Sequence, residues 1–223
     1  MKSTYHENGF YLVEKVFTEN EVKSLINELR GFKINNYGVR DLMNKVPNIR
    51  NLALTPPLFT IAQEILGEFA KPVRSVFFDK VPAANWNVAW HQDTSIAVKA
   101  KANMVGFGPW SEKQGIVHVE PPSEFLANML TLRVHLDVTD HENGVLRVVP
   151  NTHKNGRIKA MELMSIVENS EIQECKANPG DVLLICPLLF HSSRKALKPK
   201  HRRIIHIEYS ALELPKPLQW YES

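Results

Sequence analysis

The residues best suited to chemistry lie in segment 90–93, which reads Trp-His-Gln-Asp. In an extended strand, residues two apart point to the same side, so His91 and Asp93 would direct an imidazole and a carboxylate into one space while Gln92 faces away. A second histidine, His191, follows a strongly apolar segment far along the chain. Two histidines and one carboxylate, with the other positions open, suit non-haem Fe(II) that must also bind a co-substrate and O2.

A metal-free explanation of the same residues is open at this point. His-x-Asp is a short pattern that occurs often by chance, and a polar surface strand or a buried hydrogen bond between His91 and Asp93 would account for it. His191 could be a polar cap after its strand. Zinc also accepts these ligand types. The interpretation as an iron site therefore depends on the elements that bring the three residues together.

Length and composition indicate one globular domain. The chain has 223 residues, of which 43% are hydrophobic and 23% charged, with a formal net charge of +3. This weak basic charge does not by itself imply nucleic acid. Two cysteines, Cys175 and Cys186, give no disulfide framework, so we expect a cytoplasmic protein. The longest apolar run contains Pro187 and is too short to span a bilayer, so no membrane partner is expected.

Residues 1–70 predict a mainly helical brace after a short strand at 10–13. Thr18 and Glu21 form a capping box, and apolar residues at helical spacing continue to a glycine at position 31. Thr55-Pro56-Pro57 opens a second helix, because proline is tolerated in the first helical turn. Neither helix carries visible chemistry, so both are expected to pack against a sheet.

Residues 73–211 predict a core of many short strands separated by turns rich in glycine and proline. Asn143-Gly144, between the expected strands 129–138 and 145–149, is a strong hairpin signal. The pattern favours a jelly roll or barrel, mainly β with bracing helices. Residues 97–127 contain few strand signals, and a loop of this length is usually functional, so we expect a lid. Trp110 and His118 are its candidate substrate contacts, although Trp110 is equally suited to anchoring the loop.

Further polar residues could line a pocket. Lys80 and Asn85 precede the segment with His91, where turn polarity and a solvated lysine are equal alternatives. Thr131, Arg133 and His135 share one face of an expected strand, which is either the barrel interior or a solvent face. The basic loop 194–200 fits a solvated turn better than a nucleic-acid patch, because no aromatic residues are interspersed in it.

The ordered set of motifs resembles the phytanoyl-CoA dioxygenase (PhyH) family of Fe(II)- and 2-oxoglutarate-dependent oxygenases. The matching pieces are Trp90-His91-Gln92-Asp93, then residues 142–153 (Glu-Asn-Gly-Val-Leu-Arg-Val-Val-Pro-Asn-Thr-His), then Gly180-Asp181-Val182-Leu183-Leu184, His191-Ser192-Ser193 and Arg202-Arg203. The resemblance implies a double-stranded β-helix, a cupin-like jelly roll, with His91, Asp93 and His191 as iron ligands. Halogenating relatives lack the carboxylate, so its presence argues for hydroxylation.

The resemblance also implies where 2-oxoglutarate binds. Arg202, eleven positions after His191, would hold its distal carboxylate together with Ser193. The neighbouring Arg203 is the rival, and the two point to opposite faces if the strand has begun. A planar guanidinium binds a carboxylate through two parallel hydrogen bonds, so only the inward arginine would matter.

The function expected from this sequence is hydroxylation of a small or medium-sized molecule with release of succinate and CO2. Fe(II), 2-oxoglutarate and O2 would be required, and no nucleic acid or membrane partner is expected. Two alternatives are a non-catalytic jelly-roll module that binds a metal or small ligand and an oxygenase that demethylates nucleic acid. The substrate and the oligomeric state do not follow from the sequence.

Overall fold

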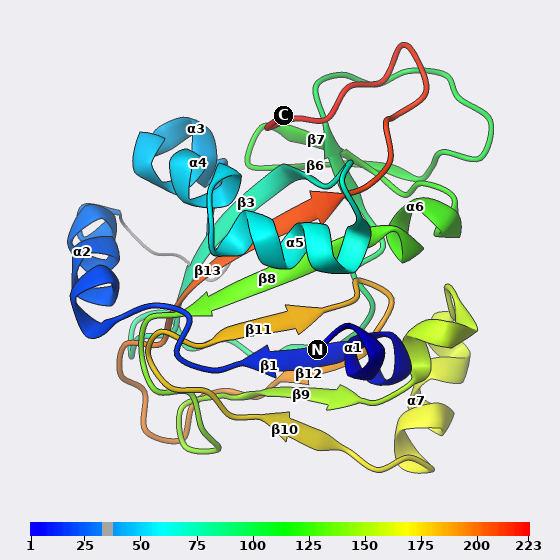
Figure 1. The fold of residues 1–223 in the computed structure, drawn as a ribbon. Helices are drawn as coiled ribbons and strands as arrows, with labels where there is room; N and C mark the ends of the chain where they lie inside the picture. Colours follow the sequence, from blue (N-terminus) through cyan, green and yellow to red (C-terminus); the bar gives the residue numbers. More distant parts are fainter. Residues whose placement is uncertain (33–37) are drawn as a thin grey trace.

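The computed structural model describes residues 1–32 and 38–223, built from antiparallel strands with helices packed outside (Figure 1). The largest sheet has six strands in the order β1-β11-β8-β13-β3-β2. Their bounds are β1 Phe10–Val13, β2 Val39–Arg40, β3 Lys71–Asp79, β8 Met129–His135, β11 Val182–Ile185 and β13 Arg203–Ser210. Apart from β2 and β3, the neighbouring strands of this sheet are not consecutive in the sequence, so the sheet is not a meander.

A second sheet of four strands, in the order β10-β9-β12-β4, completes the jelly roll. Its bounds are β4 Val88–His91, β9 Leu146–Val149, β10 Gln173–Cys175 and β12 Phe190–Ser193. The expected double-stranded β-helix is therefore confirmed. The hairpin expected at Asn143-Gly144 is wrong: β8 pairs with β11 and β13, whereas β9 pairs with β10 and β12, so this turn carries the chain from one sheet to the other.

Helices cover the outer face of the large sheet, as expected for a brace. α2 (Glu19–Leu29) begins with the expected capping box, in which Thr18 and Glu21 exchange hydrogen bonds. α5 (Leu58–Leu66) lies across the large sheet in Figure 1 and contacts β8. The sequence did not anticipate α1 (Lys2–Asn8), α3 (Leu42–Lys45) or α4 (Pro47–Leu54). The remaining helices are α6 Ser123–Ala127, the 3-10 helix Thr152–Asn155 and α7 Ala160–Glu168.

The hydrophobic core lies between this sheet face and the helices. Leu132, Val134 and Ile207 from the sheet are fully buried together with Leu58 and Ala62 from α5. The other sheet face is directed toward the four-stranded sheet and carries polar residues, so the interior between the two sheets is where a site can form. No helix in the described part of the chain combines the length and apolarity needed to cross a membrane.

Residues 97–127 are not the irregular loop that we expected. About half of them lie in a three-stranded sheet of order β5-β7-β6 and in α6, whereas residues 99–109 lie outside any helix or strand. The strands are β5 Ile96–Val98, β6 Trp110–Lys113 and β7 Ile116–Val119. The C-terminal segment lies beside this sheet in Figure 1, and its backbone bonds β5 through Lys99 N to Gln219 O and Tyr221 N to Ala97 O. That residues 97–127 act as a lid stays a prediction.

Gly180 sets the entry into β11, and its replacement should measurably destabilise the fold. Its φ is +91°, and an added Cβ would lie 2.3 Å from the backbone oxygen of Phe17. Gly67 has nearly the same φ, +92°, but an added Cβ would meet open space. We therefore expect Gly180→Ala to lower the free energy of unfolding by about 2 kcal/mol more than Gly67→Ala, the typical cost of overpacking. Urea unfolding followed by circular dichroism checks this, and equal losses would contradict it.

Candidate metal centre

The two histidines come from neighbouring antiparallel strands. β4 and β12 pair so that His91 lies opposite His191, which places both imidazoles on the same face. Asp93 follows the end of β4, and its backbone N–H donates to Pro187 O at 2.8 Å. Gln92 faces away, as expected, and donates to Leu188 O at 2.6 Å. The three ligand atoms of His91, Asp93 and His191 all lie within 4.8 Å of one another.

Both imidazoles are oriented by their own strands. His91 Nδ1 lies 2.8 Å from Ala89 O, and His191 Nδ1 lies 2.9 Å from Leu189 O. A carbonyl can only accept, so each Nδ1 carries a proton, and Nε2 is the nitrogen of each ring that is left to bind a metal ion. This is how a metal-binding histidine is normally fixed in the correct tautomer.

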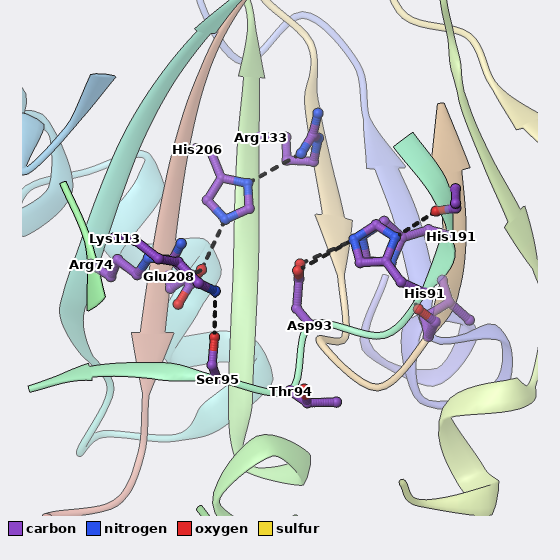
Figure 2. Close-up of polar contacts among 12 residues, drawn as sticks. Arg74, His91, Asp93, Thr94, Ser95, Lys113, Arg133, His191, His206 and Glu208 are labelled. Carbon is purple, nitrogen blue, oxygen red and sulfur yellow. Dashed lines mark hydrogen bonds and ion pairs between the residues drawn. The ribbon is translucent and has the colours of Figure 1, made fainter. Parts of the chain in front are cut away.

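Asp93 faces both Nε2 atoms without forming a short contact to either. Its Oδ1 lies 3.6 Å from His91 Nε2 and its Oδ2 lies 3.5 Å from His191 Nε2 (Figure 2). Normal hydrogen bonds of this kind measure roughly 2.7–3.2 Å. The three groups therefore surround a gap instead of bonding one another, and their donor set fits an ion such as Fe(II).

The charges at neutral pH also suit a cation. Burial alone would raise the pKa of Asp93, but His191 and His91 outweigh it and hold that pKa well below the usual range. Burial, followed by the charge of His91, lowers the pKa of His191 to about 4. The site thus offers an ionised carboxylate and a neutral imidazole before any metal binds, and metal ligands must be deprotonated in this way.

The metal ligands line a cavity of about 270 Å³ between the two sheets. Its wall also includes Phe78, Trp86, Val88, Leu146, Arg133, Ser193, Arg202, Arg40, Arg74, Ser95, Lys113, His206 and Glu208. In Figure 2, Asp93 lies between the histidine pair and a group of charged residues around Glu208. The cavity is therefore polar, and it is lined by basic groups on both sides of the metal ligands.

Arg202 reaches the cavity and Arg203 does not. Arg202 is 3% exposed and donates to Ser193 Oγ at 3.2 Å and to Gly144 O. Arg203 turns the other way and binds Asp137 through two bonds, Nε to Oδ2 at 2.8 Å and NH2 to Oδ1 at 2.7 Å. The structure thus places Arg202, not Arg203, where an anionic co-substrate could be held.

Lys80 and Asn85 support this corner from outside the cavity wall. Lys80 is fully buried and donates to Ser193 Oγ at 2.8 Å and to Arg194 O at 2.6 Å. Burial, then the charge of Arg202, lowers the pKa of Lys80 to about 7. Asn85 exchanges hydrogen bonds with the backbone of Ala196. Both residues therefore fix the chain after β12 without being part of the cavity wall, and a role for them in binding the co-substrate stays a prediction.

The three polar residues of β8 face inward, but only one reaches the cavity. Arg133 lines it and donates to His206 Nδ1 at 3.1 Å. His135 lies deeper, where its Nδ1 is 3.0 Å from Thr139 Oγ1, and Thr131 is buried opposite Glu208. The expected inward face is thus present, and Arg133 is its single member in the cavity wall.

The residues expected to contact substrate from 97–127 do not line the cavity. Trp110 packs against the hydrophobic core, which is its anchoring alternative. His118 is fully buried with Nδ1 2.9 Å from Ile116 O. Lys113, at the end of β6, is instead the residue of this segment in the cavity wall. The segment therefore contributes to the site through a residue that sequence reasoning missed.

Four other ionisable residues of the cavity wall were also missed. Arg40 and Arg74 come from β2 and β3, and His206 and Glu208 come from β13. One signal was available for the last two: His206 and Glu208 alternate with buried Ile205, Ile207 and Tyr209, so polar residues occupy one face of a strand whose other face is core. Arg40 and Arg74 carry no comparable signal, because isolated arginines are common on surfaces.

Buried His118 should make the protein less stable in acid. Burial, followed by the charge of Arg74, lowers its pKa to about 4, whereas an unfolded histidine titrates near 6.5. The unfolded chain therefore binds this proton first, so its stabilising effect is complete above about pH 6.5 and is lost as the pH falls toward 4. Acidification from about pH 7 to pH 4.5 lowers the free energy of unfolding of wild type. We expect this drop to be smaller by roughly 1–3 kcal/mol in His118→Asn.

Urea unfolding of metal-free protein at both pH values measures this difference, and metal-free protein avoids acid release of an ion. His141, which is exposed, provides the matched control His141→Asn. His118 would not carry the effect if the free energy of unfolding of His118→Asn fell with pH as steeply as that of wild type, or if that of His141→Asn fell less steeply.

A jelly roll that brings two histidines and an aspartate around one gap defines a non-haem metal centre. The chain belongs to the phytanoyl-CoA dioxygenase (PhyH) family, whose model matches residues 5–204. It is therefore an enzyme of the iron- and 2-oxoglutarate-dependent oxygenase superfamily, as the sequence motifs indicated. A comparison with curated proteins finds no match.

Solved structures share the fold at low sequence identity. HygX from Streptomyces hygroscopicus with nickel and 2-oxoglutarate bound is 18% identical, with a TM-score of 0.69 over 94% of this chain and 86% of that one. SnoK, a non-haem α-ketoglutarate-dependent carbocyclase from nogalamycin biosynthesis, is 16% identical, with a TM-score of 0.72 over 99% and 85%. EctD from S. alaskensis with bound Fe is 18% identical, with a TM-score of 0.71 over 97% and 78%.

Proposed function

We propose that the protein is an Fe(II)- and 2-oxoglutarate-dependent dioxygenase that hydroxylates a small or medium-sized organic molecule. The observation that carries this proposal is the gap enclosed by His91 Nε2, His191 Nε2 and the Asp93 carboxylate, with Arg202 in the wall of the same cavity. HygX and the epimerase SnoN have been solved with 2-oxoglutarate or α-ketoglutarate bound, which supports the same co-substrate here.

His91, Asp93 and His191 would hold the metal and leave its remaining positions open to the cavity. Bound Fe(II), 2-oxoglutarate and O2 would supply the oxidation. 2-Oxoglutarate would lose CO2 and take up one oxygen atom of O2 to become succinate, and the other oxygen atom would enter the substrate. The contribution of the chain is to fix the ligands, to hold both organic molecules beside them and to keep water out.

Arg202 would bind the distal carboxylate of 2-oxoglutarate. Its guanidinium is buried, and its present partners, Gly144 O and Ser193 Oγ, are both uncharged. Burial, followed by the charge of Arg133, lowers its pKa to about 9, so it remains charged at neutral pH. A buried guanidinium without a directly bonded carboxylate is a strong site for an incoming one.

Hydroxylation is the preferred outcome, although similar folds carry out other oxidations. SnoK is described as a carbocyclase and SnoN as an epimerase. Asp93 supplies the carboxylate ligand that halogenating relatives lack, which supports oxygen transfer to the substrate. The cavity of about 270 Å³ lies just below the roughly 300–1,000 Å³ of pockets for drug-sized ligands, so it favours a compact substrate or one compact reacting end.

The test is a metal-dependent assay with direct product detection. Protein reconstituted with Fe(II) should convert 2-oxoglutarate to succinate, and a library of small molecules screened by mass spectrometry should yield a product heavier by one oxygen atom. A chelator should abolish both signals. Binding of metal without succinate formation under any condition would favour the non-catalytic module instead.

A further inference from the structure

A second charged group lies in the same cavity, and Figure 2 shows its members Arg74, Lys113 and Glu208 on the side of Asp93 away from the histidines. It consists of Arg40, Arg74 and Lys113, hereafter the cationic cluster, together with one acid, Glu208. Glu208 is 3% exposed and pairs with Arg74 NH1 at 2.6 Å. Burial alone would raise the pKa of Glu208, but the charge of Arg74 and the bond from His206 lower it, so the carboxylate is ionised. Three cations therefore face one anion.

Two members of the cationic cluster lack an acidic partner. Arg40 Nε and NH1 are buried and have no hydrogen-bond partner in residues 1–32 and 38–223. Lys113 Nζ donates to Ser95 Oγ at 3.1 Å, which is a neutral partner. The other residues of the chain, 33–37, read Lys-Ile-Asn-Asn-Tyr and contain no carboxylate. Cations that outnumber the anions of a partly buried site are costly, so the arrangement suits a ligand that brings a further negative charge.

The cationic cluster is built onto the metal centre. Ser95, the partner of Lys113, follows Asp93 by two residues, which span at most about 7 Å. The hairpin that carries Lys113 is tied to the segment before β2, because Gln114 Nε2 donates to Gly38 O at 3.0 Å. Lys113 and Arg40 are thereby held at the same end of the cavity, close to where a metal ion would sit.

We propose that the cationic cluster binds an oxoanion of the substrate, so that the substrate is a small organic acid. Its carboxylate or phosphate would lie a few bonds from the carbon that is oxidised. This inference rests on the proposed function and adds the chemical class of the substrate. Guanidinium groups match the geometry of both oxoanions and an ammonium adds a mobile point charge. A cationic substrate would be repelled, because Glu208 is already bonded to Arg74 and His206.

The first experiment measures anion binding without turnover. Protein loaded with Ni(II) and saturating 2-oxoglutarate is titrated calorimetrically with inorganic phosphate. We expect saturable binding that weakens at least tenfold in Lys113→Met and in Arg40→Met and is unchanged in Lys101→Met, which removes an exposed lysine. The affinity for 2-oxoglutarate itself should stay within about twofold in all three variants, since Arg202 is intact.

Two results would overturn the inference. Phosphate binding that is absent, or equal in wild type and Lys113→Met, would show that the cationic cluster holds no anion. A loss of 2-oxoglutarate affinity in Lys113→Met as large as that in Arg202→Met would make the cluster the co-substrate clamp instead. Failure of the proposed function is distinct from both, because wild-type protein would then bind no 2-oxoglutarate, and phosphate binding could still be compared in the metal-free protein.

The second experiment identifies which oxoanion is used. Fe(II)-loaded protein is offered matched pairs of compounds: carboxylic acids with their methyl esters, and phosphate monoesters with the parent alcohols. Oxidised product should form from the charged member of a pair and fall at least tenfold in Lys113→Met. If the carboxylic acids are the compounds oxidised, the cationic cluster binds a carboxylate. If the phosphate monoesters are oxidised, it binds a phosphate. Equal oxidation of charged and neutral members would refute the proposal.

Discussion

Asp93→Ala should abolish the conversion of 2-oxoglutarate to succinate. The variant removes the single carboxylate ligand of the site and leaves only the two imidazoles, so metal affinity should fall by at least about tenfold, the lower end of what loss of an outer-shell partner alone produces. Direct metal titration and succinate release measure the two effects separately. Asp93→Asn, which keeps the shape but removes the charge, should resemble the alanine variant.

A structural explanation of that loss can be separated from a chemical one. Glu112→Ala removes a carboxylate from an exposed position of β6 and should leave both signals unchanged. Circular dichroism and thermal unfolding of metal-free Asp93→Ala should match wild type, because Asp93 forms no short contact to either histidine. Succinate formation at the wild-type rate in Asp93→Ala would remove Asp93 from the metal site.

Arg202→Ala should raise the KM for 2-oxoglutarate about 30-fold or more. Loss of a charge-assisted pair with a buried partner costs about 2–5 kcal/mol, and 2 kcal/mol corresponds to roughly a 30-fold change in affinity. Arg203→Ala is the matched control: it removes a neighbouring guanidinium that binds Asp137 and faces away from the cavity. It should change stability modestly and the KM little.

Initial rates of succinate release at varied 2-oxoglutarate, with metal saturating, give both constants. The reverse order, with Arg203→Ala the more damaging variant, would mean that the clamp lies on the other side of β13. An unchanged KM in both variants would transfer the clamp to another basic residue of the cavity, such as Arg133, whose charge lowers the pKa of Arg202.

Elements with local signals could be predicted from the residues alone. The capping box at Thr18 and Glu21 begins α2 because both hydrogen bonds form within one turn. The apolar segment before His191 forms β11, and His91-x-Asp93 offers two ligands from one side of the chain. The ordered motifs indicated the family, and with it the jelly roll, because their spacing is retained even where each motif alone is weak.

Local signals misled where a turn or a loop depends on distant partners. Asn143-Gly144 turns the chain as its residues predict, but the strands on either side pair in different sheets. Within residues 97–127, β6 and β7 form a local hairpin that the sequence analysis missed, whereas β5 finds its partners farther along the chain, in β7 and the C-terminal segment. Pairing of this kind is decided by side chains and backbone groups remote in sequence, which no local pattern contains.

Which polar residues reach the cavity depends on how the strands assemble. Arg202 and Arg203 are adjacent residues of the same type. Arg202 is directed inward by its bond to Ser193, and Arg203 is directed outward by its bonds to Asp137. Arg40, Arg74 and Lys113 lie on three different strands, so their juxtaposition exists only after β2, β3 and β6 assemble. A single arginine or lysine in a sequence resembles a solvated surface charge, and its meaning depends on what the fold places beside it.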